Sequence, residues 1–176
     1  HMDNERKELL EKHSELSFKY LKILTVKKNL DCIYDNLFNI FFEEKTHSGV
    51  SLFKSMIYHV IVLHDIGKIN VNFQVDRMKN EYFDKFISLD CNNTNHSMLS
   101  AMIYINEFFE ETMEVVKETN DFNIFIILLL NAYVISKHHG NFDSFEEFAR
   151  KMVSPDGEMT RLYGEQAIVF NKIYEK

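Results

Sequence analysis

The sequence predicts an all-α domain built as a helical bundle. Apolar residues recur at spacings of three and four along most of the chain, which is the period of an amphipathic helix. The 176 residues include only 5 Gly and 1 Pro, too few for the many tight turns of a sandwich or barrel. Because 45% of the residues are hydrophobic and 27% are charged, the chain can bury a core, and its length fits one domain.

Three helices are expected in the first part of the chain, each with an apolar stripe that repeats every three or four residues. Their expected ranges are 5–28, 30–44 and about 51 to 64–67, with a loop over 45–49 before the third helix. His13 shares the apolar side of the first helix. The third helix ends at His64 and Asp65, with Gly67 close behind, so a His-Asp pair lies at a helix terminus.

The stretch that follows has weaker periodicity. We expect one short helix over 76–87 and then a polar loop over 90–95. Asn95 can accept a hydrogen bond from the first turn of the next helix, as an N-cap does. That helix therefore begins at His96 and places this histidine in its first turn.

Three further helices are expected toward the C-terminus. After an acidic segment over 107–118, Asp121 can cap a helix that ends near Gly140, a residue type common at helix C-termini. Ser144 and Glu147 have the spacing of a capping box. The expected order is therefore a capped helix to residue 140, a short helix to residue 152, a turn over 154–157 and a last helix over 160–174.

Charge and composition limit the partners. The net charge of -7 argues against a protein that holds nucleic acid through a broad cationic surface, but bound cations can supply positive charge locally. The most apolar stretch, 124–135, is too short to cross a bilayer, which needs about 20 apolar residues. Cys32 and Cys91 lie far apart, in no CxxC pattern, so neither a disulfide framework nor a thiolate zinc site is suggested. We expect a cytoplasmic protein without a membrane partner.

Five of the eight histidines fall at helix ends or on apolar helix faces, and one carboxylate lies among them. These six candidate metal ligands are His13, His64, Asp65, His96, His138 and His139. Imidazole nitrogen together with carboxylate oxygen suits Mn, Fe, Co, Ni or Zn. Neighbouring residues on a helix point about 100° apart, so His64 and Asp65 cannot clamp one ion from a single face. Asp65 can instead bridge two ions held about 3.5–4 Å apart, the arrangement that favours in-line attack on phosphorus.

Four other polar residues lie near these candidates in the sequence. Lys68 is a compact cation that can neutralise charge in a phosphoryl-transfer transition state, although a lysine just after a helix is also typical of a solvated surface. Asn72, Gln74 and Ser97 can orient histidine rings or bind substrate. Plain capping and loop hydrogen bonds account for these three equally well.

Four short segments occur in a characteristic order. They are H-D-I-G-K at 64–68, N-F-Q at 72–74, H-S-M-L-S-A at 96–101 and K-H-H-G at 137–140. Together they resemble the HD-domain superfamily of metal-dependent phosphohydrolases, and within it the HD nuclease of type I CRISPR interference. The resemblance covers most of the chain. It implies an HD-domain helical bundle around a two-metal centre that cuts single-stranded DNA in antiviral defence, together with a fused or separate helicase and an RNA-guided complex.

The resemblance also implies a role for each candidate. One ion would be held by an early histidine, the histidine of the HD pair and a late aspartate, and the other by the later histidines, with the HD aspartate bridging. The matching residues are His13 and His64 for the first ion, His96, His138 and His139 for the second, Asp65 as the bridge and Lys68 near the scissile phosphate. The implied cofactors are two divalent ions of Mn, Ni, Co, Fe or Zn, with Mg as a further candidate.

The family's late aspartate has no counterpart in this sequence. The chain stops at Lys176, and Asp143 and Asp156 come too early. We therefore expect either a domain truncated at its C-terminal end or a reorganised last helix. Two alternatives to the nuclease stay open: an HD phosphohydrolase acting on a small nucleotide, and an inactive fragment that lacks its last ligand. We interpret residues 1–2 as a tag remnant and 3–176 as a single HD domain.

Overall fold

The computed structural model describes residues 9–86, 94–142, 144–153 and 164. Every regular element in these ranges is helical, which confirms the all-α prediction. In chain order the elements are α1 (Leu10–Lys28), α2 (Leu30–Phe41), α3 (His47–Leu63), η1 (Ile66–Ile69), α4 (Val71–Asp76), η2 (Glu81–Phe86), α5 (His96–Thr119), α6 (Asn123–Ser136) and α7 (Phe145–Val153), where η marks a 3-10 helix.

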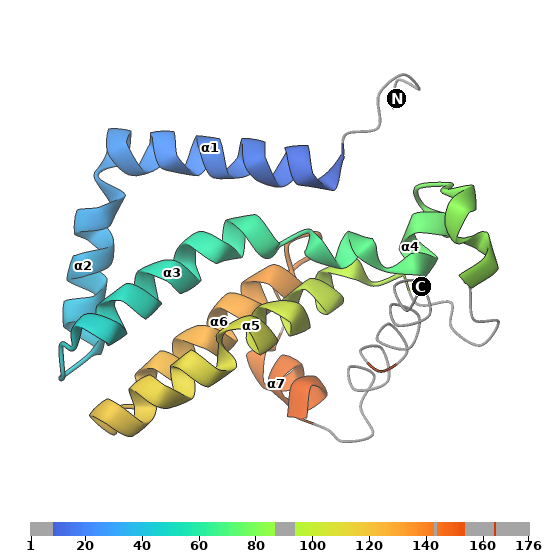
Figure 1. Ribbon diagram of the computed structural model, residues 1–176. Helices are drawn as coiled ribbons and strands as arrows, with labels where there is room; N and C mark the ends of the chain where they lie inside the picture. The colour runs from blue at the N-terminus through green and yellow to red at the C-terminus, as the bar shows by residue number, and fades with distance from the viewer. Residues whose placement is uncertain (1–8, 87–93, 143, 154–163, 165–176) are drawn as a thin grey trace.

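Helices α3, α5 and α6 pack side by side at the centre of the bundle (Figure 1). Helix α1 lies along α3, α2 connects these two, and α7 packs against α6. The core between the three central helices includes Met56, Tyr104, Leu128 and Ile135, all fully buried. The hydroxyl of Tyr104 donates to the carbonyl oxygen of Met56 at 3.0 Å and accepts from the amide of Asn131 at 3.0 Å. One phenol group thus ties α3, α5 and α6 together.

The arrangement of the central helices brings distant parts of the chain to one end of the bundle. The C-terminal end of α3, the N-terminal end of α5 and the C-terminal end of α6 meet there (Figure 1). These are the three places where the sequence has its HD pair, His96 and the pair His138 and His139. The fold therefore assembles the candidate residues at helix ends, where side chains can converge without crossing the packed core.

Two helix boundaries in the first half differ from the prediction. Helix α3 begins at His47, so the expected loop over 45–49 is wrong. The hydroxyl of Thr46 accepts a hydrogen bond from the N–H of Gly49 at 3.1 Å, and this N-cap starts the helix four residues early. Helix α2 ends at Phe41, three residues before the predicted end. The expected start of α1 at residue 5 lies outside the described residues.

The segment after Asp65 also differs. Instead of one helix over 76–87, the chain forms α4 and η2 in succession. The side chain of Asn70 accepts hydrogen bonds from the N–H groups of Asn72 and Phe73, at 2.8 and 3.4 Å, and so starts α4. Helix α5 runs without a break through the acidic segment, which the sequence left unassigned.

The last described elements follow the prediction more closely. Helix α6 ends four residues before Gly140, whose N–H donates to Lys137 in the turn that follows, so Gly140 is not the helix terminus. The hydroxyl of Ser144 accepts from the N–H of Glu147 at 3.3 Å, which confirms one half of the predicted capping box. The expected turn over 154–157 and helix over 160–174 lie outside the described residues. No helix in the described part of the chain is long and apolar enough to cross a bilayer.

Candidate metal centre

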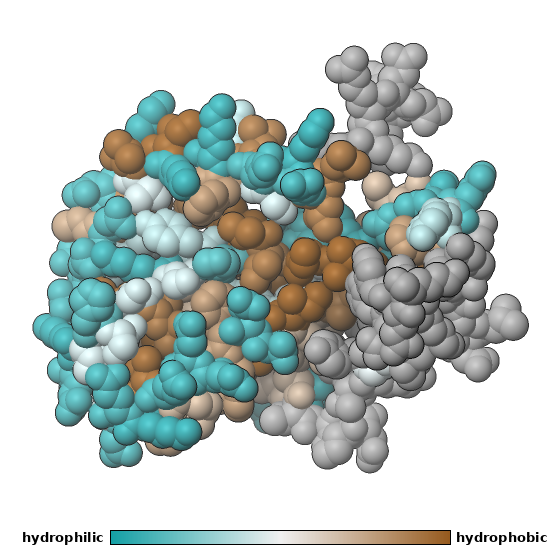
Figure 2. Space-filling model, viewed as in Figure 1, coloured by the Kyte–Doolittle hydropathy of each residue, from teal (hydrophilic) through white to brown (hydrophobic). Residues whose placement is uncertain are grey.

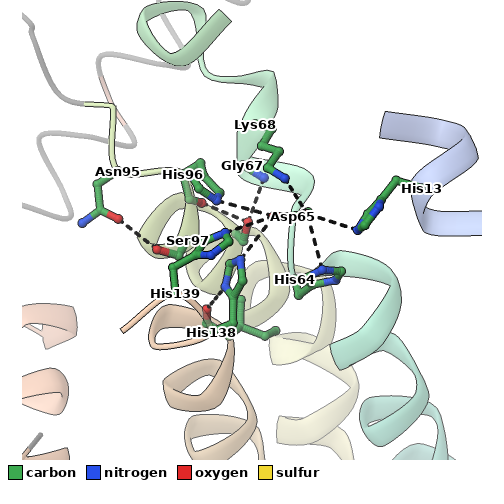
Figure 3. Close-up of polar contacts among 12 residues, drawn as sticks. His13, His64, Asp65, Gly67, Lys68, Asn95, His96, Ser97, His138 and His139 are labelled. Atoms are coloured by element: carbon green, nitrogen blue, oxygen red, sulfur yellow. Dashed lines mark hydrogen bonds and ion pairs between the residues drawn. The ribbon is translucent and has the colours of Figure 1, made fainter. Parts of the chain in front are cut away.

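The carboxylate of Asp65 lies at the centre of the candidate site. Asp65 follows α3, directly precedes η1 and is only 3% exposed. Figure 3 shows side chains from α1, from the end of α3, from the start of α5 and from the turn after α6 pointing toward this carboxylate. The six predicted candidates therefore converge, although they are spread over most of the described sequence.

The two oxygens of Asp65 face different groups of nitrogen atoms. Oδ2 lies 3.3 Å from Nε2 of His13, 3.4 Å from Nε2 of His64 and 2.7 Å from Nζ of Lys68. Oδ1 lies 3.2 Å from Nε2 of His138, 3.4 Å from Nε2 of His96 and 3.9 Å from Nε2 of His139. The side chains accordingly form two sets that could each hold an ion and that share Asp65.

The ring orientations of two histidines match those of metal ligands. Nδ1 of His64 lies 2.8 Å from the carbonyl oxygen of Ile61, and Nδ1 of His138 lies 2.6 Å from that of Ile135. A carbonyl oxygen only accepts hydrogen bonds, so Nδ1 carries the proton in both rings. Their Nε2 atoms face Asp65, and that of His138 lies within hydrogen-bond distance of Oδ1 at 3.2 Å, so a bound cation would take the place of a proton there. A backbone partner on the other ring nitrogen is usual for histidines that bind metals.

A buried nitrogen without a partner supports the same fit. Nε2 of His96 is buried and has no hydrogen-bond partner within the described structure. It lies 3.4 Å from Oδ1 of Asp65, but not in hydrogen-bond geometry. A buried polar atom without a partner is costly, and a cation between nitrogen and carboxylate would remove this cost. The donor set therefore fits divalent transition metals such as Mn, Fe, Co, Ni and Zn.

The electrostatics of the cluster keep the carboxylate ionised. Burial opposes ionisation of Asp65, but the contacts with His138, His96 and Lys68 outweigh burial and hold the pKa of this carboxyl well below its usual range. Burial alone would likewise lower the pKa of His138, yet the hydrogen bonds to Asp65 and to its backbone partner raise it above 6.5. The pKa values of His64 and His139 are lowered, mainly by burial. The surroundings of His64 and His139 thus favour the neutral imidazole that binds metals, whereas His138 holds its proton more tightly in the metal-free protein.

The residues expected to bind substrate or orient ligands lie at different distances from the carboxylate. Lys68 contacts Asp65 directly. The amide of Gln74 donates to the carbonyl oxygen of Lys68 at 2.6 Å and so holds its backbone. Asn72 is buried at the start of α4, and the hydroxyl of Ser97 donates to the side chain of the helix cap Asn95 at 3.2 Å. Their roles toward substrate stay predictions.

Two residues that the sequence analysis did not select hold the site together. A Cβ atom on Gly67 would lie 2.0 Å from the carbonyl oxygen of His96, so only glycine allows η1 to approach α5 this closely. The N–H of Gly67 donates to the hydroxyl of Ser100 at 2.8 Å. The signal was in the motifs, since Gly67 follows the HD pair and Ser100 lies one helical turn after His96, but neither residue type suggests metal chemistry.

A comparison with known families decides the identity. A sequence model described as the HD domain of Cas3 matches residues 25–166. The chain belongs to the Cas3 HD-domain family. Comparison with curated proteins finds no match, and comparison with solved structures finds none either.

Membership in the Cas3 HD-domain family confirms the resemblance stated from the motifs. It assigns the chain to the HD nucleases of CRISPR interference, and the His/Asp cluster is typical of metal binding in HD domains. The matched range includes every candidate ligand except His13, which lies in α1 before it. The described residues near Asp65 do not include the expected late aspartate, and Asp143 and Asp156 lie outside the described residues.

Proposed function

We propose that this Cas3 HD domain hydrolyses phosphodiester bonds of single-stranded DNA with two divalent metal ions. The observation that carries the proposal is the division of nitrogen atoms between the two oxygens of Asp65. Each oxygen faces its own group of imidazoles. A carboxylate in this position is suited to bridge two ions.

The chain offers a separate ligand set for each ion. The first set is His13, His64 and Oδ2 of Asp65, and the second is His96, His138, His139 and Oδ1 of Asp65. The expected late aspartate would complete the first set, which contains three members among the described residues. When bound, the two ions would polarise the phosphodiester and lower the pKa of the attacking water. The nitrogen-rich sets favour Mn, Fe, Co, Ni or Zn over Mg.

The remaining polar side chains have positioning and charge-balancing roles in this proposal. Lys68 reaches solvent beside Asp65, where its ammonium group can contact a phosphate oxygen and balance negative charge in the transition state. Gln74 fixes the backbone of Lys68 through the hydrogen bond to its carbonyl oxygen. The buried carboxylate remains ionised, so it can keep two cations close together without taking up a proton.

Solvent exposure favours a polymer over a small nucleotide as substrate. The side chains of His139 and His13, on opposite sides of Asp65, are 56% and 36% exposed. Ligands exposed on both sides leave room for a strand that enters and leaves the centre. A small nucleotide would instead be expected in a mostly enclosed pocket. In CRISPR interference, a helicase domain or subunit and an RNA-guided complex would deliver the single strand.

The test measures cleavage of single-stranded DNA, double-stranded DNA and deoxynucleoside triphosphates with added Mn²⁺, Ni²⁺ or Co²⁺. The proposal predicts metal-dependent cleavage of single-stranded DNA and none with Asp65→Asn, which keeps the side-chain size but loses the charge. Asp76→Asn, an exposed acidic residue at the end of α4, is the matched control and should cleave normally. Turnover of the triphosphates alone would favour the small-nucleotide alternative, and no turnover with any metal would favour the inactive fragment.

A further inference from the structure

A single buried hydroxyl connects two segments that carry candidate ligands. Ser100 lies one turn after His96 in α5 and is fully buried. Its Oγ accepts from the N–H of Gly67 at 2.8 Å and donates to the carbonyl oxygen of His96 at 2.9 Å. Because Gly67 is two residues after Asp65, this hydroxyl links the backbone of the HD turn to the backbone of His96.

His96 depends on such a link more than two of its neighbours do. His64 and His138 each have their ring held by a hydrogen bond from Nδ1 to the backbone carbonyl oxygen three residues earlier. His96, by contrast, has no hydrogen bond to either ring nitrogen within the described structure, and its Nε2 is buried. The ring packs against Phe73 and His139, with centroid distances of 4.6 and 4.9 Å. Its position is therefore set by ring packing and by the backbone that Ser100 fixes.

We propose that Ser100 is a positioning residue of the metal centre. It sets the separation between the carboxylate of Asp65 and the imidazole of His96, and thereby the affinity of the second ligand set for its ion. A hydroxyl is suited to this role because it can accept from one backbone group while it donates to another. The inference rests on the proposed two-ion function.

The test isolates each ligand set before changing Ser100. A His13→Ala background leaves the set that contains His96, and a His96→Ala background leaves the other. Co²⁺ affinity is measured by calorimetry, and visible absorption reports the geometry of the bound Co²⁺. Ser100→Ala should weaken Co²⁺ binding by about 10–100-fold in the first background and by less than about threefold in the second.

A matched control separates positioning from general loss of packing. Thr112→Val removes another buried hydroxyl from α5, about three turns away, and that hydroxyl has no hydrogen-bond partner in the described structure. It should leave Co²⁺ binding unchanged. Without metal, Ser100→Ala should shift the NMR signals of the His96 ring, and Thr112→Val should not.

Several results would overturn the role of Ser100. They are equal loss of Co²⁺ affinity in both backgrounds, unchanged affinity in the His13→Ala background, and an unmoved His96 signal. If the unmodified protein bound no Co²⁺, the proposed function would fail first, and this inference with it. The two failures are therefore distinguishable from the unmodified protein alone.

Discussion

Replacing Gly67 with alanine tests whether close contact between η1 and α5 builds the site. The added Cβ would lie 2.0 Å from the carbonyl oxygen of His96 and 2.8 Å from the backbone nitrogen of Ser100. Both neighbours are backbone atoms, so no flexible side chain can move aside. Since carbon and oxygen approach to about 3.3 Å, η1 and α5 must separate by roughly 1.3 Å. This displacement would carry Asp65 away from His96.

The expected cost can be stated for stability and for activity. Forcing extra atoms into a packed interior costs about 1–3 kcal/mol in the free energy of unfolding. A misplacement of about 1 Å at a catalytic centre lowers the rate on the order of 100-fold. Urea denaturation and cleavage of a labelled single-stranded oligonucleotide with Mn²⁺ measure the two effects.

Gly140→Ala is the matched control for this substitution. Gly140 also lies next to a candidate ligand, His139, but a Cβ there would meet no atom within 4 Å. Its φ is not positive, so alanine fits the backbone. Stability should stay within about 0.5 kcal/mol of the unmodified protein. If Gly67→Ala matched Gly140→Ala in stability and cleavage, the contact between η1 and α5 would not build the site.

Three further predictions concern acidity, the core and a helix cap. The raised pKa of His138 means that its proton stabilises the metal-free fold below about pH 6.5, and this stabilisation is lost as the pH rises through the folded-state value. A bound metal must displace that proton from His138. As the pH is lowered from 8 to 6, the Mn²⁺ affinity measured by calorimetry should therefore begin to fall before pH 6.5 is reached. A constant affinity over this range would contradict the prediction. Tyr104→Phe leaves the carbonyl oxygen of Met56 and the side-chain amide of Asn131 unpaired and should lower the free energy of unfolding by about 1–3 kcal/mol. Mn²⁺ affinity should stay unchanged. An unaltered urea midpoint would argue against a stabilising role for these two hydrogen bonds between the central helices. Asn70→Ala removes the cap of α4 and should lower the free energy of unfolding by about 0.5–2 kcal/mol in the same urea assay. An unchanged free energy of unfolding would contradict this role of Asn70.

Local signals in the sequence predicted the parts of the fold that depend on one element. The apolar stripes predicted the central helices, and Asn95 was correctly expected to cap α5 because the cap is a contact between near neighbours. The same kind of signal is present at Thr46 and Asn70. Both residues cap helices that the prediction placed too late in the chain. Both caps are contacts between near neighbours in the sequence.

The site is different because its geometry depends on how helices pack. Periodicity indicates that His13 faces the apolar side of its helix, but not that this side meets the end of α3. Likewise, a glycine after the HD pair is visible in the sequence, whereas the backbone of His96 that approaches it is not. The family resemblance supplied the grouping of the ligands. The two distances of Ser100, to Gly67 and to His96, required the packed structure.

The acidic composition of the chain is compatible with a polyanionic substrate because charge acts locally at the centre. The one negative charge of Asp65 is paired with the ammonium of Lys68, and metal-binding imidazoles are neutral, so two divalent ions would give the centre about four positive charges. The acidic segment of α5 begins at Glu107 and ends at Glu118. At 1.5 Å per residue, these carboxylates lie about 16–33 Å along the helix from His96, beyond the screening length of about 8 Å at physiological salt. Their repulsion of phosphate at the centre is therefore weak, and in the proposed function the attraction that draws a DNA strand to this domain would come from its ions and from its partners.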